Sequence, residues 1–291
     1  MASGVDRPIF IIGVGRSGST AFHQVLSAHP AVAWLSRLSD LCPSRPSWTR
    51  CQMRVLDVPI LGSVFQRIYE PSEAYRFWDY HCRGFSVPCR DLRADDVTER
   101  VRVHLPRVLA GVTTSRRRRI LIKITGWPRV RFLYELFPDA RFIHVLRDGR
   151  AVVNSLINVD WWFGWAGPQR WVWGDLSPAQ QAEWERHCRS FVALAAIQWK
   201  LLMDAMEEAT RGLSPRQLLT IRYEDLCADP EGAFRQAVAF CELDYPPVFG
   251  AAVRRARLRS ENDKWRQDLT ADQQRVLHEV LGEYLARYGY A

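Results

Sequence analysis

The fold of this chain is decided by residues 8–20, which read PIFIIGVGRSGST and lead into the helical pattern AFHQVL. An apolar, β-branched run that ends in glycines and then takes helical spacing predicts a buried strand, a tight loop and a helix N-terminus. The loop carries three glycines, three hydroxyl side chains and one arginine, namely Gly13, Gly15, Gly18, Ser17, Ser19, Thr20 and Arg16. Glycines let the backbone approach an anion, which N–H groups, hydroxyls and a guanidinium can then bind. The stretch therefore predicts a phosphate-binding loop.

This loop nearly fits the nucleotide-triphosphatase pattern G-x-x-x-x-G-K-[ST]. Gly13 and Gly18 have the required separation and Thr20 follows, but Ser19 stands in the place of the lysine. Without that lysine no obvious cation faces the β- and γ-phosphates, which disfavours ordinary ATP or GTP hydrolysis. A P-loop kinase-like phosphotransferase and a nucleotide-binding module without catalysis remain alternatives at this point, as does a glycine turn that only joins a strand to a helix.

Composition and length indicate a folded protein of ordinary kind. The chain has 291 residues, of which 47% are hydrophobic and 25% charged, and we expect residues 1–291 to form a single domain. Neither a membrane-spanning apolar run nor a signal-peptide core occurs, so we expect a cytoplasmic protein. The seven cysteines lack metal-ligand spacing, which predicts free thiols and no metal site. The net charge of +8 would suit nucleic acid, membrane surfaces or small polyanions, but it is widely spread, and we expect no nucleic-acid partner.

Strand-like and helix-like segments alternate along the chain. We expect strands near residues 8–12, 31–35, 119–124, 140–146 and 217–222, and a long helix over 177–210. This order predicts an α/β protein with three α/β/α layers, a central parallel sheet and a P-loop-like turn. Ligands of such sheets bind beyond the carboxyl ends of the strands, where Gly13, Lys123 and Arg147 fall. Residues 42–93 read as an irregular insertion on the acceptor side.

A further phosphate signature follows the fourth expected strand. Arg147 begins a strand-to-helix turn, and Ser155 lies eight residues later, about two helical turns away. An arginine and a serine so placed can bind one phosphate from two sides. An arginine at the sheet edge and an unrelated helical serine is the plainer alternative.

These motifs together resemble those of the sulfotransferases that use 3′-phosphoadenosine 5′-phosphosulfate (PAPS). Residues 16–20, RSGST, are similar to the family's 5′-phosphosulfate loop, with Gly15 where the family often has proline. Residues 147–155 look like its 3′-phosphate motif, residues 222–226 read RYEDL as in the family, and residues 263–270 resemble its late basic segment. The anchors span residues 8–270 in the family's order.

The resemblance implies a bacterial-type enzyme that moves a sulfuryl group in line from PAPS to a hydroxyl, leaving 3′-phosphoadenosine 5′-phosphate (PAP). The acceptor would be a small molecule, a glycan or a lipid. Lys123 and Arg16 would place positive charge near the leaving oxygen, and Tyr223 would contact the adenosine. Lys264, Trp265 and Arg266 would close over the 3′-phosphate side.

The general base is where the resemblance fails. The family's histidine two residues after the lysine is Thr125 here, and Ser36 stands nearest to the glutamate that other branches carry after the second strand. Asp40 is the candidate base, because a carboxylate near the cleft can accept the acceptor's proton. A helix cap is an equally good explanation of Asp40.

Residues 158–176 hold five tryptophans and predict a lid over an apolar or aromatic acceptor. Packing against its own domain is one alternative for this segment. Peripheral contact with a membrane that holds a lipid acceptor is another.

Overall fold

A parallel sheet forms the centre of the molecule in the computed structural model, which describes residues 4–58, 62, 70–86 and 89–290. In these ranges five strands pair in the order β2-β3-β1-β4-β5, all parallel. The strands are β1 (Ile9–Gly13), β2 (Val32–Trp34), β3 (Arg119–Thr125), β4 (Arg141–Leu146) and β5 (Leu218–Arg222). β1 lies in the middle and is buried along its whole length, as its unbroken apolar run requires.

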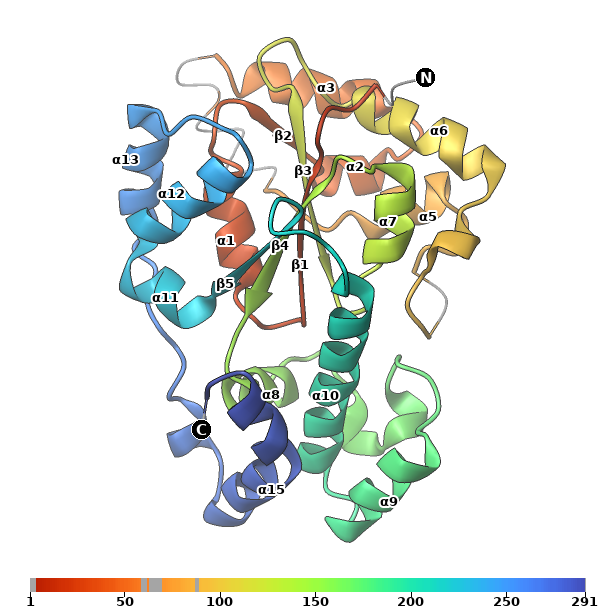
Figure 1. Cartoon of the computed structure of the whole chain (residues 1–291), viewed down its shortest axis with the longest axis vertical. Coiled ribbons are helices and arrows are strands. Elements are labelled where there is room, and N and C mark those ends of the chain that lie inside the picture. Colours follow the sequence, from red (N-terminus) through yellow and green to blue (C-terminus); the bar gives the residue numbers. More distant parts are fainter. Residues whose placement is uncertain (1–3, 59–61, 63–69, 87–88, 291) are drawn as a thin grey trace.

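Helices cover both faces of this sheet (Figure 1). The helices around it are α1 (Ser19–Leu26), α2 (Arg37–Leu41), α3 (Pro46–Val55), α5 (Tyr75–His81), α6 (Glu99–Ala110), α7 (Val130–Leu136), α11 (Tyr223–Ala228), α12 (Pro230–Phe240) and α13 (Pro247–Ala256). Figure 1 shows α1 and α11 to α13 on one side and α6 and α7 on the other. The predicted α/β fold with three layers is confirmed.

A helical layer lies beyond the carboxyl ends of the strands, in the lower half of Figure 1. This layer contains α8 (Gly149–Ile157), α9 (Pro178–Arg186), α10 (Phe191–Thr210), α14 (Trp265–Asp268) and α15 (Ala271–Arg287). The chain also forms short 3₁₀ turns at Ala94–Asp96, Gly164–Ala166 and Pro168–Arg170. Side chains of α8, α10 and α15 form a hydrophobic cluster separate from the one around the sheet. α15 begins at a capping box of Thr270 and Gln273.

The helix expected over 177–210 is wrong in one respect, because it is broken between α9 and α10. Cys188 and Arg189 have φ angles of 54° and 55°, which are incompatible with a continuous right-handed helix. The hydroxyl of Ser190 then accepts a hydrogen bond from the backbone N–H of Val192 and caps α10.

The expected insertion at 42–93 contains α3 and α5, and its residues 59–61, 63–69 and 87–88 lie outside the described ranges. Whether the chain is a single domain stays a prediction. Within the described part of the chain, no helix combines the length and apolar character that a membrane crossing requires.

Candidate active site

The phosphate loop joins the end of β1 to the start of α1, as the sequence predicts. Arg16 and Gly18 both take left-handed backbone conformations, with φ angles of 73° and 89°. A Cβ atom at Gly18 would lie 2.3 Å from Cδ2 of Tyr223, so the close approach of this ring requires glycine. No side chain of the described residues caps the N-terminus of α1, which leaves its first N–H groups available to an anion.

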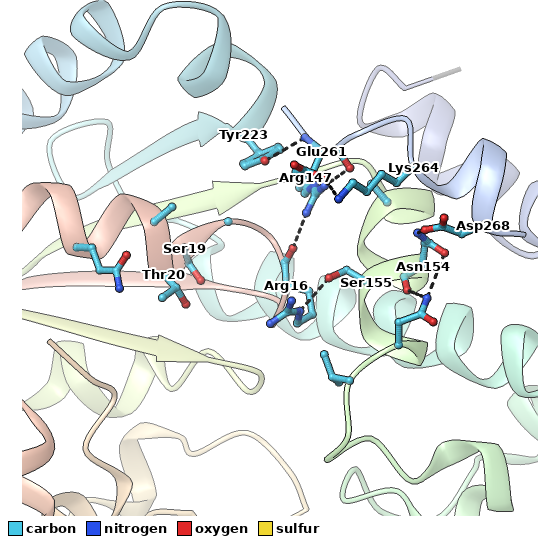
Figure 2. A pocket seen from close by; sticks show the side chains of 16 residues that line it. Arg16, Ser19, Thr20, Arg147, Asn154, Ser155, Tyr223, Glu261, Lys264 and Asp268 are labelled. Atoms are coloured by element: carbon cyan, nitrogen blue, oxygen red, sulfur yellow. Dashed lines mark hydrogen bonds and ion pairs between the residues drawn. The ribbon is translucent and has the colours of Figure 1, made fainter. Parts of the chain in front are cut away.

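Arg147 and the phosphate loop face the same cavity, which has a volume of about 590 Å³ (Figure 2). An Nη1 hydrogen of Arg147 is donated to the carbonyl oxygen of Arg16 over 3.1 Å, and Arg16 Nε donates to Ser155 Oγ over 2.9 Å. The loop and the Arg147–Ser155 segment meet because β1 and β4 are neighbours in the sheet. The two predicted anion-binding groups therefore lie side by side.

Arg147 is buried without an ion-pair partner in the described part of the chain. Only 7% of the residue is exposed, and burial lowers the pKa of its guanidinium. Its hydrogen-bond acceptors among the described residues are all neutral: Asn262 Oδ1 at 3.2 Å and the carbonyl oxygens of Arg16 and Glu261 at 3.1 and 2.8 Å. A desolvated cation without a counter-ion is suited to bind an anionic ligand.

Tyr223 forms one wall of the same cavity. Its ring lies 4.2 Å below the guanidinium carbon of Arg147, and its hydroxyl donates to the carbonyl oxygen of Arg259 over 3.0 Å. Lys264 also lines the cavity and forms an ion pair with Glu261. Tyr223 therefore places an aromatic ring in the wall of the cavity.

Trp265 and Arg266 are placed differently from Lys264, since neither lines this cavity. Trp265 is buried in the hydrophobic cluster of the helical layer, beneath the guanidinium of Arg150. Arg266 is exposed and pairs with Asp263. The tryptophan's large apolar surface explains its place in the core.

Lys123 lies at the carboxyl end of β3, beside the phosphate loop. Its Nζ donates to Thr20 Oγ1 over 2.7 Å and forms an ion pair of 2.9 Å with Glu73 Oε1. Thr125 Oγ1 donates to the same glutamate oxygen over 2.8 Å. Lys123 therefore contacts both a carboxylate and a hydroxyl of the phosphate loop.

Glu73 is a site residue that the sequence analysis missed. It lies in the irregular 42–93 region, which carries no recognisable motif. An isolated antiparallel bridge between Ser36 and Pro71 places this segment next to the end of β2, near the position where a glutamate was sought. The contact depends on tertiary structure and could not be read from local spacing.

Asp40, the base predicted from the sequence, is engaged as a helix cap. Its Oδ1 accepts hydrogen bonds from the backbone N–H groups of Arg76 and Phe77, over 3.0 and 3.3 Å, in the first turn of α5. Asp40 does line an open cavity together with Lys123 and Glu73. Its carboxylate is therefore near the site but is used structurally.

A further cavity of about 370 Å³ lies on the other side of Glu73. Gly15, Glu73 and Thr125 form its border with the phosphate loop and β3. Its apolar lining comes from Tyr75, Trp127, Leu156, Trp161, Val172 and Trp173. The Trp127 and Trp173 rings meet edge to face with centroids 6.0 Å apart, so this part of the wall is aromatic.

The tryptophan-rich segment 158–176 is divided between packing and exposure. Trp162 and Trp171 are buried in the helical layer's cluster, whereas Trp161 and Trp165 are exposed. The segment contributes Trp161, Val172 and Trp173 to the aromatic cavity. Its role as a lid stays a prediction. Among the described residues no group of three metal-ligating side chains occurs.

The parallel sheet, the P-loop-like turn and the paired anion-binding groups define the class as α/β proteins that bind phosphorylated ligands at the strands' carboxyl ends. The sequence pattern of the sulfotransferase family matches residues 8–247. This chain belongs to that family. It is therefore a sulfotransferase.

Individual relatives and solved structures agree with this assignment. The omega-hydroxy-beta-dihydromenaquinone-9 sulfotransferase Stf3 of Mycobacterium tuberculosis is 24% identical over an alignment 307 residues long. The alignment covers 98% of this chain and 76% of Stf3. The fold is similar to that of sulfotransferase STF9 from Mycobacterium avium, with a TM-score of 0.62, 19% identity and coverage of 97% and 77%. STF1 from Mycobacterium tuberculosis has a TM-score of 0.55, 17% identity and coverage of 96% and 77%.

Proposed function

We propose that this sulfotransferase binds PAPS in the cavity between the phosphate loop and Arg147, and receives its acceptor in the aromatic cavity beyond Glu73. The observation that carries the proposal is the buried, unpaired guanidinium of Arg147 beside the uncapped N-terminus of α1. Arg147 and Ser155 would bind the 3′-phosphate, and residues 15–20 would bind the 5′ side. Tyr223 would stack on the adenine, and Lys264 would exchange its pairing with Glu261 for the ligand's charge.

PAPS supplies the sulfuryl group. In the transfer, the bond from sulfur to the phosphate oxygen breaks and a bond from sulfur to the acceptor's hydroxyl oxygen forms. Lys123 would stabilise the charge that develops on the leaving oxygen, and its hydrogen bond to Thr20 Oγ1 holds it against the loop. Arg16 would add a second cation on the same side. Trp265 and Arg266 have no direct role in this proposal.

Glu73 is our candidate for the general base. Its carboxylate borders both the acceptor cavity and the Lys123 side of the site, so it can accept the proton that leaves the acceptor's hydroxyl. Lys123 and Thr125 orient it through the hydrogen bonds described above. Asp40 remains a second candidate, although its engagement with α5 favours Glu73.

The acceptor is proposed to be an apolar or aromatic hydroxyl compound, either a small molecule or a lipid. The aromatic lining of the cavity supports this, as does the name of the relative Stf3, an omega-hydroxy-beta-dihydromenaquinone-9 sulfotransferase. Trp161 and Val172 line the cavity and are exposed, as are Phe163 and Trp165 of the same segment, which supports peripheral contact with a membrane surface. All seven cysteines lie in the described ranges and are free, in keeping with a proposed cytoplasmic location.

Two measurements test this function. Calorimetry should show tighter binding of PAP than of ATP, and the opposite order would contradict the assignment of the cavity. Turnover of labelled PAPS with a panel of phenols, sugars and lipid alcohols should be fastest with apolar or aromatic hydroxyls. A preference for sugars would contradict the proposed acceptor class.

A further inference from the structure

A buried arginine lines the proposed acceptor cavity, and only 4% of it is exposed. Arg129 Nε donates to the carbonyl oxygen of Phe85 over 3.1 Å, and Nη1 donates to that of Trp127 over 2.8 Å. Its guanidinium carbon lies 4.6 Å from the centroid of the Phe85 ring. Asp91 accepts from the backbone N–H of Arg129 and not from the guanidinium. Within the described ranges, no carboxylate oxygen lies within 4.0 Å of the guanidinium nitrogens.

This arrangement leaves hydrogen-bonding capacity directed at the cavity. A guanidinium has five N–H donors, of which the two carbonyl oxygens use two, and Nη2 has no acceptor among the residues that the structure describes. Burial of a charge is costly unless an opposite charge and hydrogen bonds compensate for it. The nearby pair of Glu73 and Lys123 is neutral as a unit. Asp91 interacts electrostatically with Arg129, and the Arg129 charge lowers the pKa of that carboxyl against the effect of its burial. Arg129 therefore gives the cavity a positive charge that is only partly compensated and that no ion pair neutralises among the described residues.

Gln198 on α10 contributes a neutral donor to the same cavity. It is 2% exposed, and its Oε1 accepts a hydrogen bond of 2.9 Å from Trp162 Nε1. Because an indole can only donate, this contact fixes the amide with its oxygen toward Trp162. The NH₂ group consequently faces the other way, and no acceptor for it is found among the described residues.

We propose that the acceptor is a hydroxy acid, whose carboxylate binds Arg129 and Gln198 while its apolar or aromatic body lies along Trp127 and Trp173. This inference rests on the proposed function, which makes this cavity the acceptor site. A single unpaired positive charge suits a monoanionic carboxylate better than a dianionic phosphate, which Glu73 at the cavity's border would repel. The planar guanidinium also matches a carboxylate in a bidentate manner.

The test compares 3-(4-hydroxyphenyl)propanoate with its primary amide, which has the same shape and no charge. The wild-type enzyme should show a kcat/KM for the acid that is about ten- to a hundredfold higher than for the amide, as expected for a charge-assisted hydrogen bond. Equal values, or a preference for the amide, would overturn the proposal. If neither compound is turned over, tryptophan fluorescence of the PAP-bound protein should still report tighter binding of the acid; equal or tighter binding of the amide would overturn it.

Arg129→Gln should remove the preference for the acid, and Arg131→Gln serves as the matched control. Arg131 lies two residues away, lines a different cavity and donates to the backbone carbonyl of Arg211. A preference that survives in Arg129→Gln would overturn the assignment of Arg129.

Calorimetry with PAP distinguishes failure of the proposed function from failure of the hydroxy-acid inference. If the wild-type protein does not bind PAP, the proposed function fails, whereas PAP binding without acid preference refutes only the hydroxy-acid inference. Should Arg129→Gln fail to fold, the comparison of acid and amide on the wild-type enzyme decides.

Discussion

Replacing Glu73 by glutamine is expected to slow sulfuryl transfer while leaving PAP binding almost unchanged. The glutamine carbonyl can still accept the hydrogen bonds that Lys123 and Thr125 now give to Glu73 Oε1, at 2.9 and 2.8 Å. What is lost is the negative charge and the ability to accept a proton. A positioned general base contributes about 10²- to 10⁴-fold to a rate, so kcat should fall by that factor.

The same substitution has a limited cost in stability. Removing one partner of a fully buried ion pair costs about 3–5 kcal/mol. The side chain of Glu73 is 20% exposed, and Lys123 keeps its hydrogen bond to Thr20, so we expect a loss below that range. The variant should therefore remain folded and measurable.

Initial rates with saturating labelled PAPS and calorimetric PAP affinities provide the assay. Asp40→Asn is the discriminating partner variant, because Asp40 lines the neighbouring open cavity and caps α5. A large fall in kcat for Asp40→Asn together with normal turnover for Glu73→Gln would refute the assignment of Glu73 as the base.

Three further perturbations test other parts of the site and fold. Lys123→Met should lower kcat by about 10²-fold or more, with a much smaller change in PAP affinity; an unchanged kcat would remove Lys123 from the transfer step. Gly18→Ala should weaken PAP binding, because a Cβ would lie 2.3 Å from the Tyr223 ring and the φ of 89° adds strain of about 1–3 kcal/mol; wild-type affinity would contradict this. Burial lowers the pKa of His144 from 6.5 to about 4, so the unfolded chain binds a proton that the folded chain does not, and stability that is present above pH 6.5 is lost as the pH falls. The loss from this residue should reach about 2 kcal/mol near pH 5 and be absent in His144→Asn, as measured by urea unfolding; an equal pH dependence in the variant would exclude this cause.

The fold could be predicted well because the central strands β1, β3 and β4 are predominantly apolar and almost wholly buried. The contact between the phosphate loop and Arg147 was also accessible, since both follow strands whose carboxyl ends meet at one edge of the sheet. The break between α9 and α10 was missed because Cys188 and Arg189 adopt left-handed conformations without a glycine or proline to mark them. Ser190, a favourable N-cap residue, was the available signal.

The acceptor side could not be predicted in the same way. Glu73 reaches Lys123 from a segment with no periodic pattern, and Arg129 follows β3 in a turn with a left-handed φ of 52°. The contact of Glu73 with Lys123 and that of Arg129 with Phe85 each join residues that are distant in sequence. Both contacts depend on how the irregular segment folds over the sheet. Trp265 is a different case, because the family resemblance implies a ligand contact, whereas the side chain packs in the hydrophobic cluster of the helical layer.

The most direct test of the account compares the affinities of PAP and adenosine 5′-monophosphate, which differ only in the 3′-phosphate, for the wild-type protein and Arg147→Ala. Because each charge-assisted hydrogen bond contributes about 1.5–3 kcal/mol, the wild-type protein should bind PAP at least about tenfold more tightly, and Arg147→Ala should lose most of that difference. Using the ratio within each protein cancels any general effect of the substitution on folding. A variant that keeps the full preference for PAP would show that Arg147 does not bind the 3′-phosphate and would contradict the central claim that one cavity holds both ends of the nucleotide.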